Sequence, residues 1–194
     1  MNGLYIILLI YSCFMINLVL QCALGIKGVV ESKKPIDTAT IVKSFVLFFS
    51  IVLLWFVFSR LLYSVISGIY IYILIFPVSA LVYDGLEYII FRYLLKQDSK
   101  SESIISFPAG ITAVAVFICI NIADNIIETA VMSLGFTGSI YLINLIVREI
   151  RRRAALEEVP VFLRGKPLVL VTMGLLSLIF TTASLLIFRM IGAE

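Results

Sequence analysis

The chain has 194 residues, of which 62% are hydrophobic, and its mean hydropathy is +1.14. These values, together with several apolar runs longer than about 18 residues, describe a polytopic helical membrane protein with no soluble domain left over. The sequence contains no His, which excludes imidazole metal ligands and His-dependent catalytic triads, and its net charge of +3 is explained by an anionic membrane surface without any nucleic-acid partner.

Six apolar runs follow one another along the chain. They cover residues 4–26, 41–59, 62–95, 104–122, 126–147 and 168–191. The third run exceeds the roughly 20 residues that a bilayer needs, so we expect it to tilt or to continue beyond the hydrocarbon. The sequence therefore predicts an all-α integral membrane protein, a single polytopic domain over residues 1–194 with six transmembrane helices.

Lys and Arg are distributed unevenly between the two sides of this predicted topology. Cationic residues near span ends are retained on the cytoplasmic side. Of the 15 Lys and Arg residues, only Arg60 and Arg189 fall on the side that carries the termini, and the other thirteen flank the first, third and fifth loops. We therefore predict that both termini lie outside.

The order of the spans suggests a 3+3 inverted repeat, with halves of about 1–100 and 101–194, because a repeat unit with an odd number of spans inserts its second copy upside down. Small and polar residues interrupt the first and fourth runs, where we expect broken helices that pair at the centre. An alternative is that these residues only allow close helix packing. The residues are Asn17, Gln21, Cys22 and Gly25 in the first run, and Pro108, Gly110 and Thr112 in the fourth.

Few ionisable residues lie near the spans. Asp124 and Glu128 are one helical turn apart before the fifth run, and with Asn17 they are candidates for an ion path. The alternative for the two acids is a solvated helix start, where carboxylates are favourable. Asp84 and Glu87 are expected to form interfacial ion pairs with Arg92 and Lys96.

The basic cluster of Arg148 and residues 151–153 has two interpretations. It anchors a helix end at the headgroups, or it docks an acidic cytoplasmic subunit. The segment that follows carries the most specific pattern in the chain. Residues 150–165, IRRRAALEEVPVFLRG, lead into a span with Gly174-Leu175 and Ser177-Leu178.

This pattern resembles the small six-span subunits of the Rnf and Nqr electron-transport complexes, and the resemblance extends over nearly the whole chain. An outside N-terminus is more similar to the RnfA or NqrE member than to its RnfE or NqrD sibling. Weaker collinear matches are Asn17 to Leu20, Leu24-Gly25, Lys33-Lys34, Asp37-Thr38-Ala39, Glu87 and Glu128.

The resemblance implies a location in a bacterial or archaeal cell membrane and a function in redox-driven translocation of Na⁺ or H⁺. It implies as partners a homologous membrane subunit of opposite insertion and the other subunits of such a complex. In the family, each of the paired subunits contributes two cysteines to one membrane-embedded [2Fe–2S] cluster.

The chain departs from the family at both ligand positions, because Lys27 and Val114 stand where the cysteines belong and neither can ligate iron. Cys22 and Cys119 are candidates for relocated ligands. Cys22 lies five residues before Lys27, and Cys119 lies five residues after Val114. Each is therefore displaced from the family position by about 7.5 Å along its helix axis, and its side chain is rotated from that position by roughly 140°. The alternative for both is an ordinary buried cysteine.

The sequence thus predicts an Rnf/Nqr-like membrane subunit that kept the scaffold and lost its iron–sulfur ligation. Two other functions stay open: a stand-alone secondary transporter with a site where the first and fourth spans meet, and a purely structural assembly subunit.

Overall fold

The computed structural model describes residues 2–25, 38–62, 69–90, 92, 108–154 and 165–191, and every regular element in these ranges is helical. The helices are α1 (Asn2–Ile10), α3 (Thr38–Phe56), α4 (Ile69–Ile90), α5 (Pro108–Ile122), α6 (Ile126–Ala154) and α7 (Lys166–Ile191). Two π-helical turns continue α1 and α3: η1 (Tyr11–Met15) and η2 (Val57–Leu62).

Four helices in the described ranges are long and apolar enough to cross a membrane, rather than the six expected. They are formed by residues 41–60, 72–90, 126–154 and 166–187. The other two apolar helices are shorter, at Leu4–Met15 and Gly110–Ile122. The 15 residues of α5 measure only about 22 Å, less than the hydrocarbon core of a typical bilayer.

Of the two expected helix breaks, only the one in the first apolar run is present among the described residues. The first apolar run leaves helical geometry at Ile16, which has φ −104° and ψ 57°, so a break is present there. The fourth run contains no break within the described residues, because Gly110 and Thr112 lie inside the continuous helix α5. Pro108 is the first residue of that helix, where proline is well tolerated since its missing N–H would have no partner.

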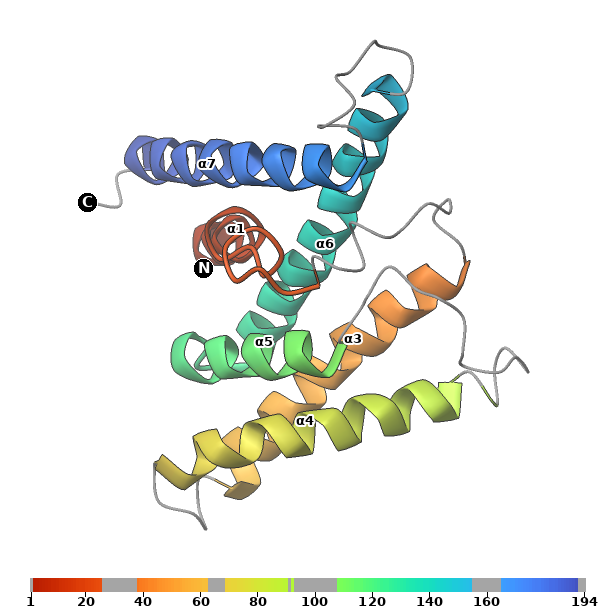
Figure 1. The fold of residues 1–194 in the computed structure, drawn as a ribbon. Helices are drawn as coiled ribbons and strands as arrows, with labels where there is room; N and C mark the ends of the chain where they lie inside the picture. Colours follow the sequence, from red (N-terminus) through yellow and green to blue (C-terminus); the bar gives the residue numbers. More distant parts are fainter. Residues whose placement is uncertain are drawn as a thin grey trace.

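The helices pack in an order that crosses between the two halves of the chain (Figure 1). The second helices of the two halves, α3 and α6, pack directly on each other, while α1 and η1 pack on α6, and η1 also packs on α7. In the same way, α5 packs on α3 and α4. Among the described residues, direct contact of α1 and η1 with α5 is at most marginal, so these helical parts of the first and fourth runs do not show the expected central pairing. Each of them packs on the opposite half instead.

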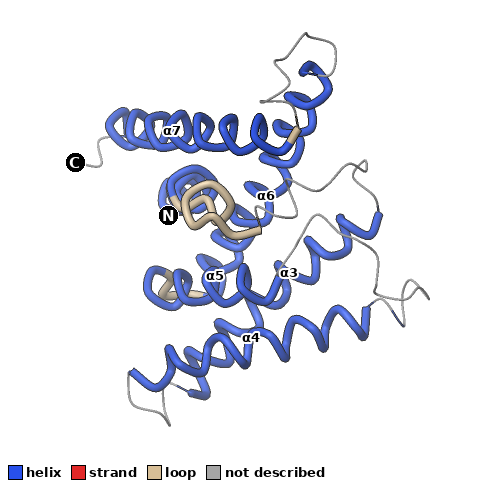
Figure 2. The backbone as a smooth tube through the Cα atoms, viewed as in Figure 1, coloured by secondary structure: helices blue, strands red, loops and turns tan. Residues whose placement is uncertain are grey.

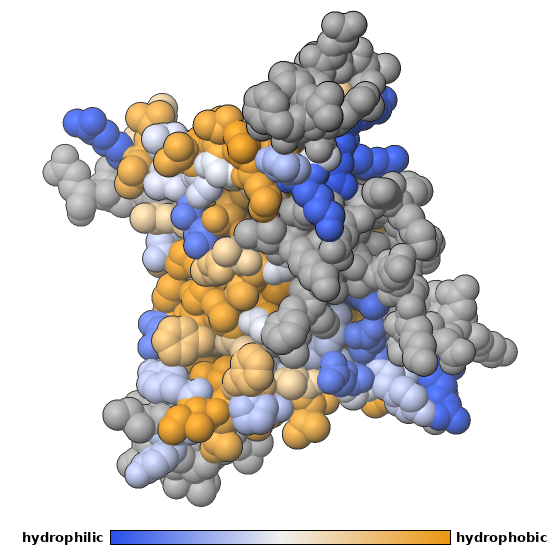
Figure 3. Space-filling view, viewed as in Figure 1, coloured by the Kyte–Doolittle hydropathy of each residue, from blue (hydrophilic) through white to orange (hydrophobic). Residues whose placement is uncertain are grey.

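Burial separates inner from outer helices. The apolar windows of α3 and α6 are 44% and 50% buried, whereas those of α4 and α7 are both 17% buried. The tube in Figure 2 shows α4 and α7 at opposite edges of the molecule, and Figure 3 shows hydrophobic side chains covering much of the face over α7, α1 and α5. The outer helices therefore leave apolar surfaces exposed, and the inner ones form the core.

The core also contains small hydroxyl side chains, which are common between packed membrane helices. Most of them donate a hydrogen bond to a backbone carbonyl three or four residues earlier, as Ser50 does to Val46 (2.7 Å) and Ser139 to Phe136 (2.8 Å). The bonded hydroxyls therefore add polarity to the apolar interior while their donors stay satisfied.

Candidate functional site

The break in the first apolar run is built around Asn17, whose side chain is fully buried. Its Oδ1 accepts hydrogen bonds from the backbone N–H groups of Val19 and Leu20, both at 3.1 Å. Its Nδ2 donates to the carbonyl of Cys13 at 3.2 Å. These bonds satisfy backbone groups that a helix end would leave unpaired in an apolar interior. Because both lone pairs of Oδ1 are used, Asn17 has none to offer an ion in this conformation.

The chain after the break is compact. Leu18 and Val19 are 0% and 1% exposed, and Ala23 adopts a left-handed conformation with φ 57°. The Gln21 side chain donates a hydrogen bond to Thr181 Oγ1 on α7 at 2.6 Å. Irregular backbone at membrane depth is tolerated only where protein surrounds it. Here residues 17–19 are buried, whereas Gln21, Cys22 and Ala23 are exposed.

A very close helix approach holds η1 against α6. A Cβ atom added to Gly135 would overlap the Ser12 side chain, so only glycine fits at this position. The Ser12 hydroxyl donates to the carbonyl of Leu9 at 3.1 Å, which keeps it satisfied in this contact. The contact fixes the position of the helix end that precedes the break.

A nearly buried ion pair joins α3 to α4. Lys43 Nζ lies 3.0 Å from Glu87 Oε1, and the side chains are only 8% and 13% exposed. Tyr83, one helical turn before Glu87, is fully buried, and its hydroxyl has no hydrogen-bond partner among the described residues. Charges buried in an apolar span are costly, and they commonly mark a functional site or a paired structural element.

This ion pair corrects the expected partners of Glu87. Lys43 lies in helix α3, and it pairs with Glu87 where Arg92 was one of the expected partners. Arg92 instead donates a hydrogen bond to the hydroxyl of Tyr88, with its guanidinium 5.4 Å from the ring centre. Lys96 is outside the described residues. The sequence signal that was missed is a single cation inside the apolar run 41–59.

The cysteines proposed as relocated iron ligands lie in unlike environments. Cys119 is fully buried in α5, whereas Cys22 is exposed in the segment after the break. Val114, at one of the family ligand positions, is half-buried in α5. Lys27, at the other position, lies outside the described residues. Within the described ranges, no group of three or more His, Cys, Asp or Glu side chains is placed to hold a metal ion.

Asp124 and Glu128 meet at the beginning of α6. The Glu128 carboxylate accepts a hydrogen bond from the backbone N–H of Asp124 at 2.9 Å, in the manner of the reciprocal bond of a helix capping box. Thr129 N–H bonds the carbonyl of Asn125 at 3.0 Å and closes the first turn. Glu128 therefore serves the helix start, while the carboxylate of Asp124 is exposed.

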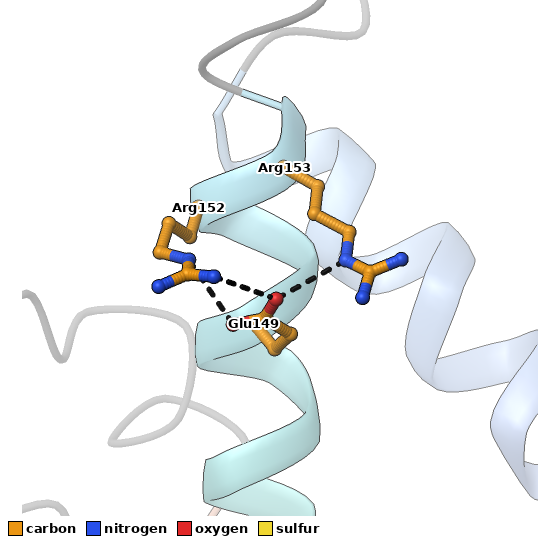
Figure 4. Close-up of polar contacts among 3 residues, drawn as sticks. All are labelled: Glu149, Arg152 and Arg153. Atoms are coloured by element: carbon orange, nitrogen blue, oxygen red, sulfur yellow. Dashed lines mark hydrogen bonds and ion pairs between the residues drawn. The ribbon is translucent and has the colours of Figure 1, made fainter.

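The basic cluster lies at the opposite end of α6 (Figure 4). Arg152 and Arg153 both pair with Glu149, at 3.2 and 3.1 Å, and the arginine side chains are 75% and 74% exposed. Exposed pairs of this kind add little to stability. With Arg148 and Arg151 on the same end, they leave a net positive surface, and hydrophilic side chains gather around this end of α6 in Figure 3.

A scan against protein-family models finds no match for the chain, and a search of curated proteins also finds none.

Proposed function

We propose that the chain is an integral membrane subunit of an ion-translocating electron-transport complex of the Rnf/Nqr type, in which it acts as a scaffold or ion path. The resemblance of residues 150–178 and of the collinear segments supports the family. The helix packing supports the inverted-repeat scaffold, and it is the observation that carries the proposal.

The proposed repeat relates α1–η1 to α5, α3 to α6 and α4 to α7. In the first half, α1–η1 packs on α6 and α7, the second and third helices of the other half. In the second half, α5 packs on α3 and α4, which are likewise the second and third helices of the other half. Exchanging the halves also matches the short first helices, the buried second helices and the outer third helices. A threefold agreement of this kind is what an inverted duplication of three spans would leave.

The proposed orientation follows from the same arrangement. The basic end of α6, the start of α7 and the end of α4 lie toward the cytoplasm of a bacterial or archaeal cell, and both termini lie outside. Cations near span ends support this assignment. The inverted homologous subunit would pack beside this chain in the membrane, and acidic cytoplasmic subunits would meet the arginine cluster.

We further propose that this subunit has no iron–sulfur cluster of its own. Lys27 and Val114 replace the two family cysteines, and the buried Cys119 and exposed Cys22 do not share one environment. A thiolate ligand is required at each replaced position. The chain would then support the complex and pass ions, with the electrons carried by other subunits.

The test is purification of the tagged full-length chain from its native membrane under mild detergent, followed by assays of iron, acid-labile sulfide, flavin and associated subunits. The proposal expects flavin- or iron-containing partners. Recovery of the chain without any redox partner would overturn it. Stoichiometric iron that is lost in Cys22→Ser or Cys119→Ser would overturn the loss of the cluster alone.

The buried Lys43–Glu87 pair favours one second candidate, a stand-alone secondary transporter, because paired charges inside spans often line transport pathways. This candidate expects substrate or ion flux in liposomes that contain this chain alone, and loss of flux in Glu87→Gln. A chain that recruits partners but carries neither ions nor electrons would be an assembly subunit.

A further inference from the structure

A cavity of about 600 Å³ opens where η2 ends and where α5 turns into α6. Trp55 from α3 and Ile120 from α5 line its walls, so both halves of the chain contribute to it. Phe56 and Ile127 also line the cavity and remain 48% and 57% exposed to the surroundings. The cavity is therefore continuous with an apolar outer surface.

Two opposite charges line the same cavity. Arg60 and Asp124 are both exposed, and within the described residues neither has a salt-bridge partner. Ser59 adds a hydroxyl oxygen that is buried and has no hydrogen-bond partner in the described part of the chain. A buried hydroxyl without a partner is uncommon in proteins, and it points to a missing polar group in the cavity.

The position of the cavity relates it to the membrane interface. The apolar stretch Ile41–Arg60 ends at Arg60, and Asp124 immediately precedes the stretch Ile126–Ala154. Both charges therefore lie at span ends, where headgroups meet the hydrocarbon. Tyr and Trp side chains are typical of this depth.

The balance of charge decides which headgroup fits. The lining carries one cation, Arg60, and one anion, Asp124. A second carboxylate, that of Glu128, lies beside Asp124 because it accepts a hydrogen bond from the Asp124 backbone N–H. An anionic headgroup would gain from Arg60 but would be repelled by the acids. A zwitterionic headgroup places its phosphate at Arg60 and its ammonium at Asp124, so both charges are paired.

We propose that this cavity binds the headgroup of a zwitterionic phospholipid, phosphatidylethanolamine in particular. Its primary ammonium donates hydrogen bonds to Asp124, which the methylated ammonium of phosphatidylcholine cannot do. The Ser59 hydroxyl donates to the phosphate, and the acyl chains follow Phe56 and Ile127. This site is independent of the electron-transport proposal.

The experiment uses the full chain in detergent micelles doped with dioleoyl phosphatidylethanolamine, phosphatidylcholine or phosphatidylglycerol at equal mole fraction. Native mass spectrometry measures lipid retention, and thermal unfolding measures protection. We expect phosphatidylethanolamine to be retained most strongly. Arg60→Gln and Asp124→Asn should each weaken its retention by roughly tenfold, as the loss of one charge-assisted hydrogen bond implies.

Two matched variants control for the loss of charge alone. Arg189→Gln removes an exposed cation from α7 and Asp84→Asn an exposed acid from α4, and neither residue lines the cavity. Both should retain the lipid as the parent chain does, and circular dichroism verifies folding of all four variants. Equal retention of the three lipids would overturn the proposal. Equal protection by soluble phosphoethanolamine would also overturn it, because the acyl chains would then contribute nothing.

Discussion

The two halves of the molecule use the same packing scheme but stabilise it by different polar groups. In the first half, Lys43 and Glu87 form a nearly buried ion pair between α3 and α4, and Asn17 closes a break after η1. In the second half, α5 is unbroken, and the buried polar groups of α6, such as Ser133, Ser139 and Asn144, bond within their own helix. The first half therefore carries the features that are costly to maintain.

This difference indicates where function is to be sought. Self-satisfied hydroxyls in α6 need no partner and are compatible with packing alone. In the buried ion pair each charge needs its partner, and at the buried helix break the backbone N–H groups need the Asn17 side chain. Removing one partner leaves the other group unpaired in a low-dielectric interior, which is costly. Substitutions of these buried polar groups in the first half should consequently have larger effects than substitutions of the self-satisfied hydroxyls in the second.

The largest effect is expected from breaking the ion pair. Lys43→Met leaves Glu87 buried and unpaired, so we expect a loss of about 3 to 5 kcal/mol in the free energy of unfolding. The double variant Lys43→Met/Glu87→Leu should recover most of this loss, because no isolated charge remains. Unfolding of the detergent-solubilised protein by a graded denaturant measures both.

Glu149→Gln is the matched control for the ion pair. Glu149 also pairs with cations, but the pairs are exposed, so the unfolding curve should not move. Equal destabilisation by Lys43→Met and Glu149→Gln would show that burial does not distinguish the two sites.

The next largest effect concerns the contact between η1 and α6. Gly135→Ala forces a methyl group into Ser12 and should cost about 1 to 3 kcal/mol, which is typical of an overpacked core. Gly138→Ala, one turn later on the same helix, meets nothing within 4 Å. This control should be neutral or stabilising, because alanine is the better helix former. Similar losses for both variants would contradict the close approach.

An effect of similar size is expected at the break itself. Asn17→Ala removes the acceptor of two backbone N–H groups and should cost about 1 to 3 kcal/mol, the range for leaving buried groups unsatisfied. Asn121→Ala is the control, since Asn121 is exposed and both of its hydrogen bonds, to the Phe117 carbonyl and from the Tyr72 hydroxyl, are exposed as well. Thermal unfolding of the two variants compares them, and an unchanged midpoint for Asn17→Ala would show that the break needs no cap.

Much of the helical framework could be predicted from local sequence. The apolar runs located each helix of the described ranges, and Asn17 marked the segment where the first helix ends, because polar and small residues in a span signal irregular backbone. A proline in a span can either interrupt a helix or begin one, and Pro108 begins α5, while residues 104–107 before it lie outside the described residues. Sequence alone did not distinguish these two roles.

The long-range contacts could not be predicted in the same way. Lys43 and Glu87 are far apart in the chain, and nearer partners for Glu87 were available in Arg92 and Lys96, so only the packing of α3 on α4 reveals their pairing. The close approach of Gly135 to Ser12 likewise depends on how η1 crosses α6. Such contacts result from tertiary packing and leave no periodic signal in the sequence.

The central claim, that the halves are inverted copies, is tested most directly by labelling single cysteines with a membrane-impermeant maleimide in intact cells. In a background without Cys13, Cys22 and Cys119, cysteine is placed at the beginnings of corresponding helices, Tyr70 for α4 and Lys166 for α7. The account predicts labelling at position 70 from outside and at position 166 only after the membrane is opened. Labelling of both positions from the same side would contradict the inversion.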